Sequence, residues 1–199
     1  LGGEPMIART VRAFQECDAV SQIVIVTRED LILPITSLCK AYPKVTAVVA
    51  GGKSRQESVG KGLNALSKDV KLAAIHDGAR PLITWQLIDW VIRAANTYGA
   101  AAPAIPVKDT IKTVEGGLVV NTPDRSKLNA VQTPQVFDFA LLRGALKKAK
   151  QDGLAITDDC SAVEHLGMSV KIVEGDERNI KITTPLDLKL AEMILEELK

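Results

Sequence analysis

Three apolar runs recur in the first part of the chain, and each is followed by a segment with helical spacing. The runs are residues 22–27, 44–50 and 72–75. Continuous β-branched runs without polar alternation are typical of strands buried on both faces of a parallel sheet. Between the last two runs, Val59 and Leu63 lie on one face of a predicted helix. Strands that alternate with helices predict right-handed βαβ units.

Start and stop signals place the other predicted helices. Pro5 suits the first turn of a helix that continues with apolar residues at helical spacing. Thr84 suits an N-cap position, and Gly99 suits the end of the same helix. Further helices are predicted after Asp138, near Thr157 and at Thr184-Pro185, and Asp187 takes the capping-box position of the last one. Two more strands are predicted, at Val170–Val173 and Asn179–Ile182.

Residues 107–131 break the alternation of strands and helices. Ile111–Val114 and Leu118–Asn121 flank the turn sequence Glu115-Gly116-Gly117, which predicts a β-hairpin. A lone hairpin is marginally stable in water, so we expect this one to project as an arm and to pack against another subunit.

The chain length and these patterns together predict one domain over residues 1–199, with the arm at 107–131 within it. A chain of 199 residues is long enough for one well-buried core. The predicted fold class is α/β, a doubly wound, Rossmann-like and mostly parallel sheet with a projecting β-hairpin arm. In such folds, ligands bind at the carboxyl ends of the strands.

Composition and charge narrow the kind of partner. The chain has 25 basic and 24 acidic side chains, so it lacks the global positive field that holds nucleic acid or a membrane surface. Three cysteines without CxxC spacing and only two histidines argue against a zinc site and a disulfide framework. No apolar run approaches a membrane span, and no signal peptide is visible. These features predict a small-molecule site in a cytoplasmic protein.

The sequence Asp77-Gly78-Ala79-Arg80-Pro81 follows the third apolar run directly. A carboxylate binds a hard cation through oxygen, and an arginine fork grips a phosphate bidentately. The pair therefore suits a metal-chelated phosphate. The same residues are also compatible with a plain turn, in which Asp77 caps the backbone and Arg80 is a solvated charge.

Other clusters also suit ligand binding, but each is compatible with a purely structural role as well. The Gly51-Gly52 pair, followed by Ser58, leaves backbone groups free to bind a base edge or a ribose. The alternative is an ordinary strand-to-helix turn. Thr157-Asp158-Asp159 fits a helix N-cap. Lys181, near the end of a predicted strand, can aim its ammonium into the ligand crevice. Residues 60–65 match a dinucleotide fingerprint by letters only, because no strand precedes them.

A series of motifs in fixed order covers nearly the whole chain: Gly51-Gly52-x-x-Arg55-Gln56-x-Ser58-Val59, His76-Asp77-x-Ala79-Arg80-Pro81, Pro106-Val107-x-Asp109-Thr110-x-Lys112, Gln132-Thr133-Pro134-Gln135-x-Phe137, Thr157-Asp158-Asp159 and Asn179-Ile180-Lys181-x-Thr183-Thr184-Pro185-x-Asp187-Leu188. Together they resemble the 2-C-methyl-D-erythritol 4-phosphate cytidylyltransferase family. The resemblance implies an Mg²⁺-dependent homodimer in which the methylerythritol phosphate attacks the α-phosphorus of CTP and pyrophosphate leaves.

The resemblance also implies roles for individual residues. Gly51, Gly52 and Ser58 correspond to part of the cytidine pocket, and Asp77 lies where metal and ribose meet. Lys181 and Arg125 are implied to position the substrate phosphate for attack. The residues implied to hold methylerythritol phosphate are Arg80, Thr110, Arg125, Thr133, Thr157 and Lys181. Because the family's arm reaches a neighbouring subunit, Thr110 and Arg125 are expected to serve a site across a dimer interface.

Two departures from the family pattern bear on these expectations. Gly78 stands where alanine is common, which loosens the turn. The family's first strand and its glycine-rich loop, with an arginine and a lysine that clamp the triphosphate, correspond to no residues of this sequence and would precede Leu1. We therefore expect the native protein to extend upstream, and we expect an unpaired apolar groove where that strand would lie.

Several alternatives remain open at this point. A ribitol 5-phosphate cytidylyltransferase resembles the chain across the same motifs, and sugar-nucleotide transferases resemble it more distantly. A module of a different class, which binds a nucleotide or forms a dimer without catalysing transfer, also fits a chain that lacks the triphosphate clamp.

Overall fold

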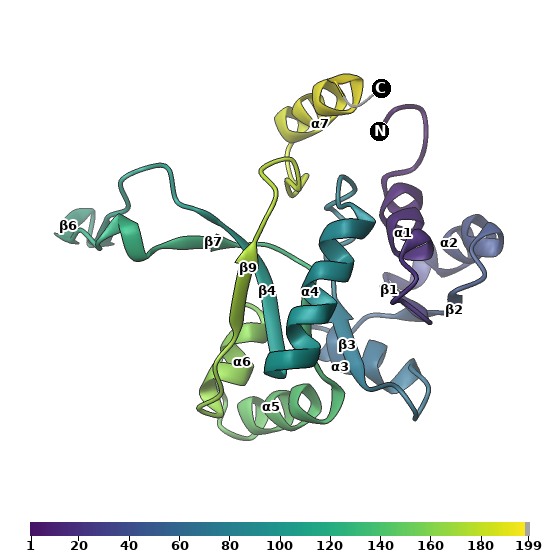
Figure 1. The fold of residues 1–199 in the computed structure, drawn as a ribbon, viewed down its shortest axis with the longest axis horizontal. Coiled ribbons are helices and arrows are strands. Elements are labelled where there is room, and N and C mark those ends of the chain that lie inside the picture. The colour runs from purple at the N-terminus through teal and green to yellow at the C-terminus, as the bar shows by residue number, and fades with distance from the viewer. Residues whose placement is uncertain (198–199) are drawn as a thin grey trace.

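A five-stranded sheet forms the centre of the molecule, of which the computed structural model describes residues 1–197 (Figure 1). Its strand order is β3–β8–β4–β7, and β9 also pairs with β4. The bounds are β3 Leu72–Ile75, β4 Ala100–Pro106, β7 Asn129–Val131, β8 Gln135–Asp138 and β9 Lys171–Glu174. β9 is parallel to β4, and β8 is antiparallel to both β3 and β4, so β3, β4 and β9 share one direction.

A second, two-stranded sheet lies beside the first. β1 (Ile23–Thr27) and β2 (Val45–Ala50) pair in parallel, at the two positions where the first apolar runs predict strands. Helix α2 (Ile32–Leu38) connects the two strands and packs against β2. Buried Ile25 and Cys39 join this small sheet to Val11 of the first helix.

Helices cover both faces of the five-stranded sheet, which is the doubly wound arrangement expected from the sequence. α1 (Met6–Glu16) and α4 (Trp85–Tyr98) share one hydrophobic core with Val136 and Val173 of the sheet. The opposite core is formed by α3, α5 and α6 around Phe137. The bounds of these three helices are α3 Arg55–Ala65, α5 Phe139–Gln151 and α6 Asp159–His165. The α/β, Rossmann-like class is therefore confirmed.

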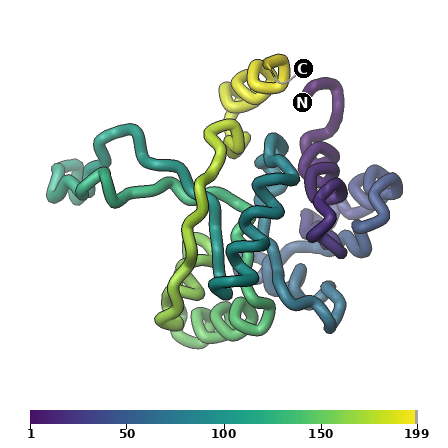
Figure 2. The backbone as a smooth tube through the Cα atoms, viewed as in Figure 1, coloured from purple at the N-terminus to yellow at the C-terminus, as the bar shows by residue number. Residues whose placement is uncertain are grey.

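The arm leaves the body between β4 and β7 and consists of β5 (Thr113–Glu115) and β6 (Leu118–Asn121). Gly116 and Gly117 make the turn between them with positive φ angles of 56° and 82°, a conformation that glycine adopts without strain. Figure 2 shows the chain running out along the arm and returning beside its starting point. The predicted hairpin is thus confirmed.

The predicted helix boundaries are confirmed at their caps. The Thr84 hydroxyl accepts a hydrogen bond from the Leu87 N–H, and Gly99 ends α4 in the left-handed conformation. The last helix, α7 (Pro185–Glu197), begins where the sequence indicates. The Asp187 carboxylate accepts hydrogen bonds from the Thr183 and Thr184 N–H groups, and these bonds lower the pKa of Asp187 to about 2.

One predicted strand is wrong, and three strands of the large sheet, β4, β7 and β8, were not predicted. Residues 179–182 form an extended loop instead of a strand, because their backbone groups bond outside any ladder: the Asn179 N–H donates to Asp176 and the Ile182 N–H donates to Ala79. β4 was not predicted because it consists mainly of alanine and proline, and both residue types are depleted in strands.

The letters that mimic a dinucleotide fingerprint lie inside α3, as the sequence context indicates. Gly62 has a packing reason instead. A Cβ atom at this position would lie 2.9 Å from Cγ2 of Val26. The glycine therefore lets α3 approach β1 closely.

Candidate functional site

Three charged side chains converge where β3 ends. Lys181 Nζ lies 3.0 Å from Oδ2 of Asp77, and Arg80 Nε lies 3.9 Å from the same oxygen. Burial opposes ionisation of the carboxyl group, but the hydrogen bond and the charge of Lys181 outweigh it and keep the pKa of Asp77 below its usual range. The carboxylate is therefore ionised at neutral pH between two cations.

The Arg80 guanidinium is fixed from behind by the loop that follows β9. One terminal N–H donates to the Asn179 carbonyl at 2.6 Å, and the Arg80 backbone N–H closes a turn on the Asp77 carbonyl. Arg80 Nε is buried and has no hydrogen-bond partner among residues 1–197. Its side chain is only 13% exposed, so it is a positioned group and not a solvated surface charge.

A chain of hydrogen bonds lies directly behind Asp77. The Asp77 N–H donates to Oγ1 of Thr133, which lies 3.0 Å from Nδ1 of His76. His76 Nε2 lies 3.3 Å from the Arg80 carbonyl. Since a carbonyl can only accept, Nε2 carries the proton and Nδ1 accepts from the Thr133 hydroxyl. Thr133 is buried, so its hydroxyl holds the Asp77 turn together.

Acidification is expected to destabilise the protein through His76. Burial lowers the pKa of His76 from 6.5 to about 4 in the folded chain. Between these values the unfolded chain binds more protons, so the free energy of unfolding falls as the pH falls, by at most about 3 kcal/mol and by less where water screens the ring. Denaturant titrations of the wild type and His76→Gln between pH 7 and 4 check this, and equal pH slopes would contradict it.

Arg55 and Asp159 form a second ion pair close by. Arg55 Nη2 of α3 lies 2.6 Å from Oδ2 of Asp159, the first residue of α6. The Asp159 side chain is completely buried, and burial raises its pKa against the opposing effect of Arg55. For Arg55, burial works against the charged form, but the hydrogen bond and charge of Asp159 prevail and raise its pKa. The pair joins two motifs that lie far apart in the sequence.

The Gly51-Gly52 turn lies at the start of α3. The Gly52 N–H donates to the Ser58 hydroxyl at 3.0 Å, and that hydroxyl donates to the Ser54 carbonyl. A Cβ atom on Gly52 would lie 2.3 Å from Cβ of Glu57, so only glycine fits there. The turn is therefore built for a close approach of backbone and helix.

A cavity of about 640 Å³ connects these groups. Its wall includes Arg55, Ser58 and Asp77, so one of the predicted cytidine residues and the predicted metal ligand lie on one cavity. The same cavity runs between the two sheets, along residues 23–26 of β1 and 72–75 of β3. An apolar groove thus lies between these strands, as the sequence comparison with the family leads one to expect.

The remaining predicted site residues lie apart from this cluster. Thr110 and Arg125 are exposed on the arm, where an Arg125 guanidinium N–H donates to the Lys108 carbonyl at 2.7 Å. Thr157 is exposed just before Asp158, whose carboxylate caps α6. Within residues 1–197 no hydrogen bond or ion pair joins these three to Asp77, Arg80 or Lys181. Their roles remain predictions.

Sequence reasoning did not single out several residues that hold the site together. They share polar or charged side chains and a position inside a recognised motif: Arg55, Gln132, Gln135, Asp159 and Asn179. Four of the five are almost fully buried, although polar. Buried polar side chains need hydrogen-bond partners. A polar residue within an apolar stretch of sequence was therefore the signal that could have identified these residues.

Comparison with known proteins agrees with the motif order. The family model for 2-C-methyl-D-erythritol 4-phosphate cytidylyltransferase matches residues 1–197. The chain is 46% identical to such an enzyme of Symbiobacterium thermophilum over 99% of this chain and 83% of the relative. It is 48% identical to one of Halalkalibacterium halodurans over 99% of this chain and 87% of the relative.

Solved structures give the same result at the level of the fold. The 4-diphosphocytidyl-2C-methyl-D-erythritol synthase of Anaerococcus prevotii superposes with a TM-score of 0.92 at 30% identity, covering 98% of this chain and 88% of that one. The Thermus thermophilus cytidylyltransferase superposes with a TM-score of 0.84 at 36% identity, covering 98% and 91%. This chain therefore belongs to the 2-C-methyl-D-erythritol 4-phosphate cytidylyltransferase family.

Proposed function

We propose that Asp77, Arg80 and Lys181 form the centre at which this nucleotidyltransferase joins CTP and 2-C-methyl-D-erythritol 4-phosphate to give CDP-methylerythritol and pyrophosphate. The observation that carries the proposal is their convergence at the carboxyl end of β3, the edge at which ligands bind in α/β sheets. The family relationship supports methylerythritol phosphate over ribitol phosphate as the acceptor.

The chemistry needs alignment and charge neutralisation more than proton transfer. The substrate phosphate is already a nucleophile, but it must approach another polyanion. In the proposed mechanism, the Lys181 ammonium and the Arg80 guanidinium hold this phosphate in line with the α-phosphorus. Its oxygen forms the new P–O bond while the bond to pyrophosphate breaks. A cation that is already in position stabilises the charge of the transition state effectively, because it does not have to reorient during the reaction.

Asp77 is the proposed protein ligand for Mg²⁺. In the described chain, no three His, Cys, Asp or Glu side chains are grouped to hold a metal ion by themselves. A single carboxylate fits Mg²⁺ nonetheless, because this ion is commonly bound by one or two carboxylates together with substrate phosphates and water. When bound, the ion would neutralise developing charge on the triphosphate. Asp77, whose Oδ2 lies 3.0 Å from the Lys181 ammonium, would be its protein ligand.

Cytidine recognition is proposed for the Gly51-Gly52 turn and Ser58. Ser58 shares a cavity wall with Asp77, and its hydroxyl accepts from the Gly52 N–H of the turn, which supports binding of base and ribose at this end and phosphates at the other. Thr133 is proposed to act indirectly, since its hydroxyl holds the Asp77 N–H. Thr157 is proposed as a contact to the polyol, because it is exposed at the N-terminal end of α6.

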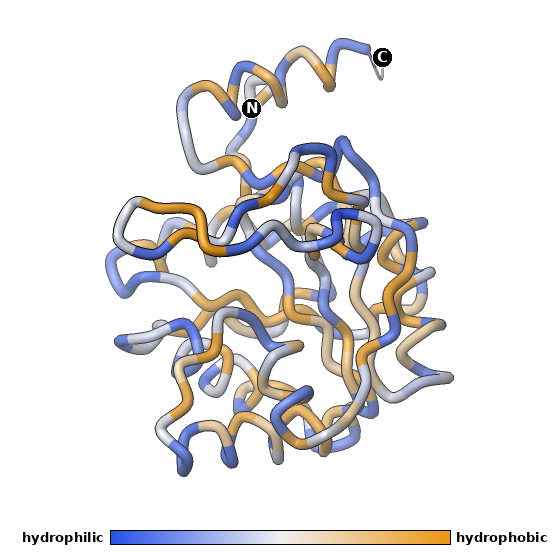
Figure 3. Tube along the Cα trace, turned by 90° about the vertical axis from the view of Figure 1, so that its left-hand side faces the viewer, coloured by the Kyte–Doolittle hydropathy of each residue, from blue (hydrophilic) through white to orange (hydrophobic). Residues whose placement is uncertain are grey.

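The arm is proposed to form a homodimer and to bring Thr110 and Arg125 to the partner's site. The arm exposes an unusually apolar surface, visible as orange segments in Figure 3. Its exposed apolar side chains are Ile111, Val114, Leu118, Val119, Val120 and Val131. A surface of this kind marks an interaction site, since isolated apolar hairpins are poorly stable in water.

Charging the arm is expected to convert a dimer into monomers. Leu118→Asp combined with Val120→Asp places two charges on β6, whose four residues are all exposed, and burial of these charges in an interface would be costly. Light scattering should show half the mass of the wild type, and pyrophosphate release should fall with it. Leu33→Asp on α2, which is 81% exposed, is the matched control and should change neither. A monomeric wild type would refute the proposed interface.

Pyrophosphate release by the full-length protein tests the proposed reaction. CTP, Mg²⁺ and methylerythritol phosphate should give release, and ribitol 5-phosphate should give little. Release with ribitol 5-phosphate alone would transfer the assignment to that substrate. If neither polyol phosphate gives pyrophosphate release but CTP binds in calorimetry, the result would favour a non-catalytic nucleotide-binding module. Omission of Mg²⁺ in the same assay tests the proposed metal dependence.

A cytoplasmic location is proposed from the thiols. Cys17, Cys39 and Cys160 are all free and buried, which suits a reducing compartment. None of the helices within residues 1–197 has both the length and the apolar character needed to cross a bilayer.

A further inference from the structure

The segment Gln132-Thr133-Pro134-Gln135 ties three different parts of the site together. Thr133 holds the Asp77 turn, as described above. The Gln135 side-chain oxygen Oε1 accepts from the Asp159 and Cys160 N–H groups at the start of α6. Gln132 bonds the loop that carries Lys181. All three side chains are nearly inaccessible, so the segment acts as an internal junction.

Gln132 and Asn179 form a clasp of two buried amides within this junction. Gln132 Nε2 donates to the Asp176 carbonyl at 2.8 Å, and Gln132 Oε1 accepts from the Asp176 N–H at 3.3 Å. Asn179 Nδ2 donates to Gln132 Oε1 at 3.3 Å and to the Thr133 carbonyl at 3.0 Å. The Asn179 residue is completely buried. The clasp therefore fixes both ends of the turn at residues 176–179.

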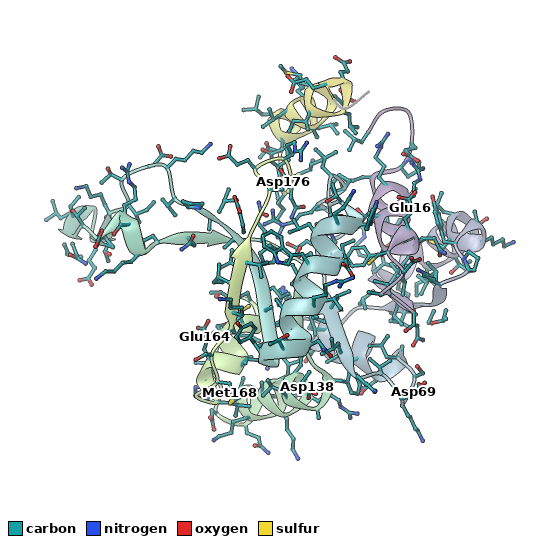
Figure 4. The ribbon with its side chains drawn as sticks, viewed as in Figure 1. Glu16, Asp69, Asp138, Glu164, Met168 and Asp176 are labelled. Atoms are coloured by element: carbon teal, nitrogen blue, oxygen red, sulfur yellow. The ribbon has the colours of Figure 1, made fainter. Side chains whose placement is uncertain are left out.

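The clasped loop supplies one of the three charged side chains, Lys181, and anchors a second, Arg80. The Asn179 carbonyl accepts from the Arg80 guanidinium at 2.6 Å. Two residues later, Lys181 reaches Asp77, and the Ile182 N–H donates to the Ala79 carbonyl at 2.8 Å. Figure 4 labels Asp176 where the chain leaves β9 on its way to α7. Lys181 thus stands between two backbone anchors, one of which is the clasp.

Close packing leaves the clasp no alternative position. A Cβ atom on Gly175 would lie 2.7 Å from Gln132 Oε1 and 3.1 Å from the carbonyl group of Ala104 in β4. The Gly175 N–H also donates to that Ala104 carbonyl at 2.8 Å. The loop is therefore held against the central strand of the sheet, at a distance that only glycine permits.

We propose that Gln132 and Asn179 are positioning residues for cytidylyl transfer, which place Lys181 and the Arg80 guanidinium over Asp77. The inference rests on the proposed role of Lys181. A lysine side chain is long and flexible, and that of Lys181 is 47% exposed, so its aim depends on where the backbone is held. Misplacing a reacting group by about 1 Å can cost about 100-fold in rate.

Asn179→Ala is the direct test. We expect kcat for pyrophosphate release to fall about 100-fold while KM for CTP changes little, because the misplaced group acts on the other substrate. If Asn179 acts through Lys181, the double variant Asn179→Ala/Lys181→Ala should be no slower than Lys181→Ala. Losses that multiply, or an unchanged kcat with only a lowered Tm, would overturn the inference. Gln132→Ala gives an independent second variant if Asn179→Ala fails to fold.

Glu177→Gln is the matched control on the same loop. Glu177 is exposed and pairs with Lys108 at 2.7 Å, outside the clasp, so its loss should leave kcat unchanged. A readout without turnover separates this inference from the proposed reaction. Acylation of Lys181 by a small amine reagent should be slow in the wild type and should rise in Asn179→Ala to the rate seen in Asp77→Ala. An unchanged acylation rate would overturn the inference even if the parent enzyme released no pyrophosphate.

Discussion

Lys181→Ala is expected to lower kcat for pyrophosphate release by a factor of about 100 to 1,000. Its ammonium lies 3.0 Å from the Asp77 carboxylate, at the proposed meeting point of the substrate phosphate and CTP. Removing one preorganised charge-stabilising group typically costs this much when the group acts mainly in the transition state. CTP affinity, measured by calorimetry, should change little, because the proposed contact is with the polyol phosphate.

The control for this result is another exposed lysine. Lys189→Ala on α7 removes the same charge away from the cluster and should leave kcat unaltered. Lys181→Arg keeps the charge but presents a planar fork, so partial activity is expected. Full activity of Lys181→Ala would leave the lysine with a structural ion pair only.

Arg55→Ala is expected to lower the free energy of unfolding by about 3 kcal/mol at pH 7. The change leaves the Asp159 carboxylate without its cation in a position where its side chain is fully buried. Breaking one partner of a buried pair is costly because the other charge stays desolvated. Denaturant unfolding followed by circular dichroism measures the loss.

The pH dependence of this loss identifies its cause. Without Arg55, burial raises the pKa of Asp159 further above its unfolded value, so the folded variant binds a proton more readily than the unfolded chain. The destabilisation should therefore shrink as the pH falls from 7 to 5. Arg28→Ala breaks an exposed pair with Asp30 and should cost less than about 0.5 kcal/mol at either pH. An equal effect of both substitutions would exclude the burial argument.

The parts of the fold that local signals specify were predictable. β3 and the caps of α4 lie where apolar runs, Thr84 and Gly99 indicate. The closeness of Asp77 and Arg80 was also predictable, because one short motif at the carboxyl end of β3 carries both. Each of these inferences needed only residues close together in the sequence and one rule of topology.

The parts that depend on distant pairing were not predictable in this way. Arg55 and Asp159 are 104 positions apart, and each has an ordinary local explanation in a helix terminus. The strand predicted at 179–182 failed because Arg80 and Ala79 take its backbone groups, and neither partner is visible from the loop's own sequence. Sequence spacing does not reveal which buried amide meets which backbone group.

The division of the strands into two separate sheets has a consequence for how the molecule opens. β1 and β2 share no hydrogen-bonded ladder with the five-stranded sheet in the part of the chain described. Side-chain packing and a few hydrogen bonds outside any ladder, such as those from Ser67 to Gln22, join the two units. Regions held in this way can unfold locally below the global free energy. In native-state hydrogen exchange, the amides of residues 23–50 should therefore exchange together, with an opening free energy below that of global unfolding. The amides of β4 and β8 should exchange only through global unfolding.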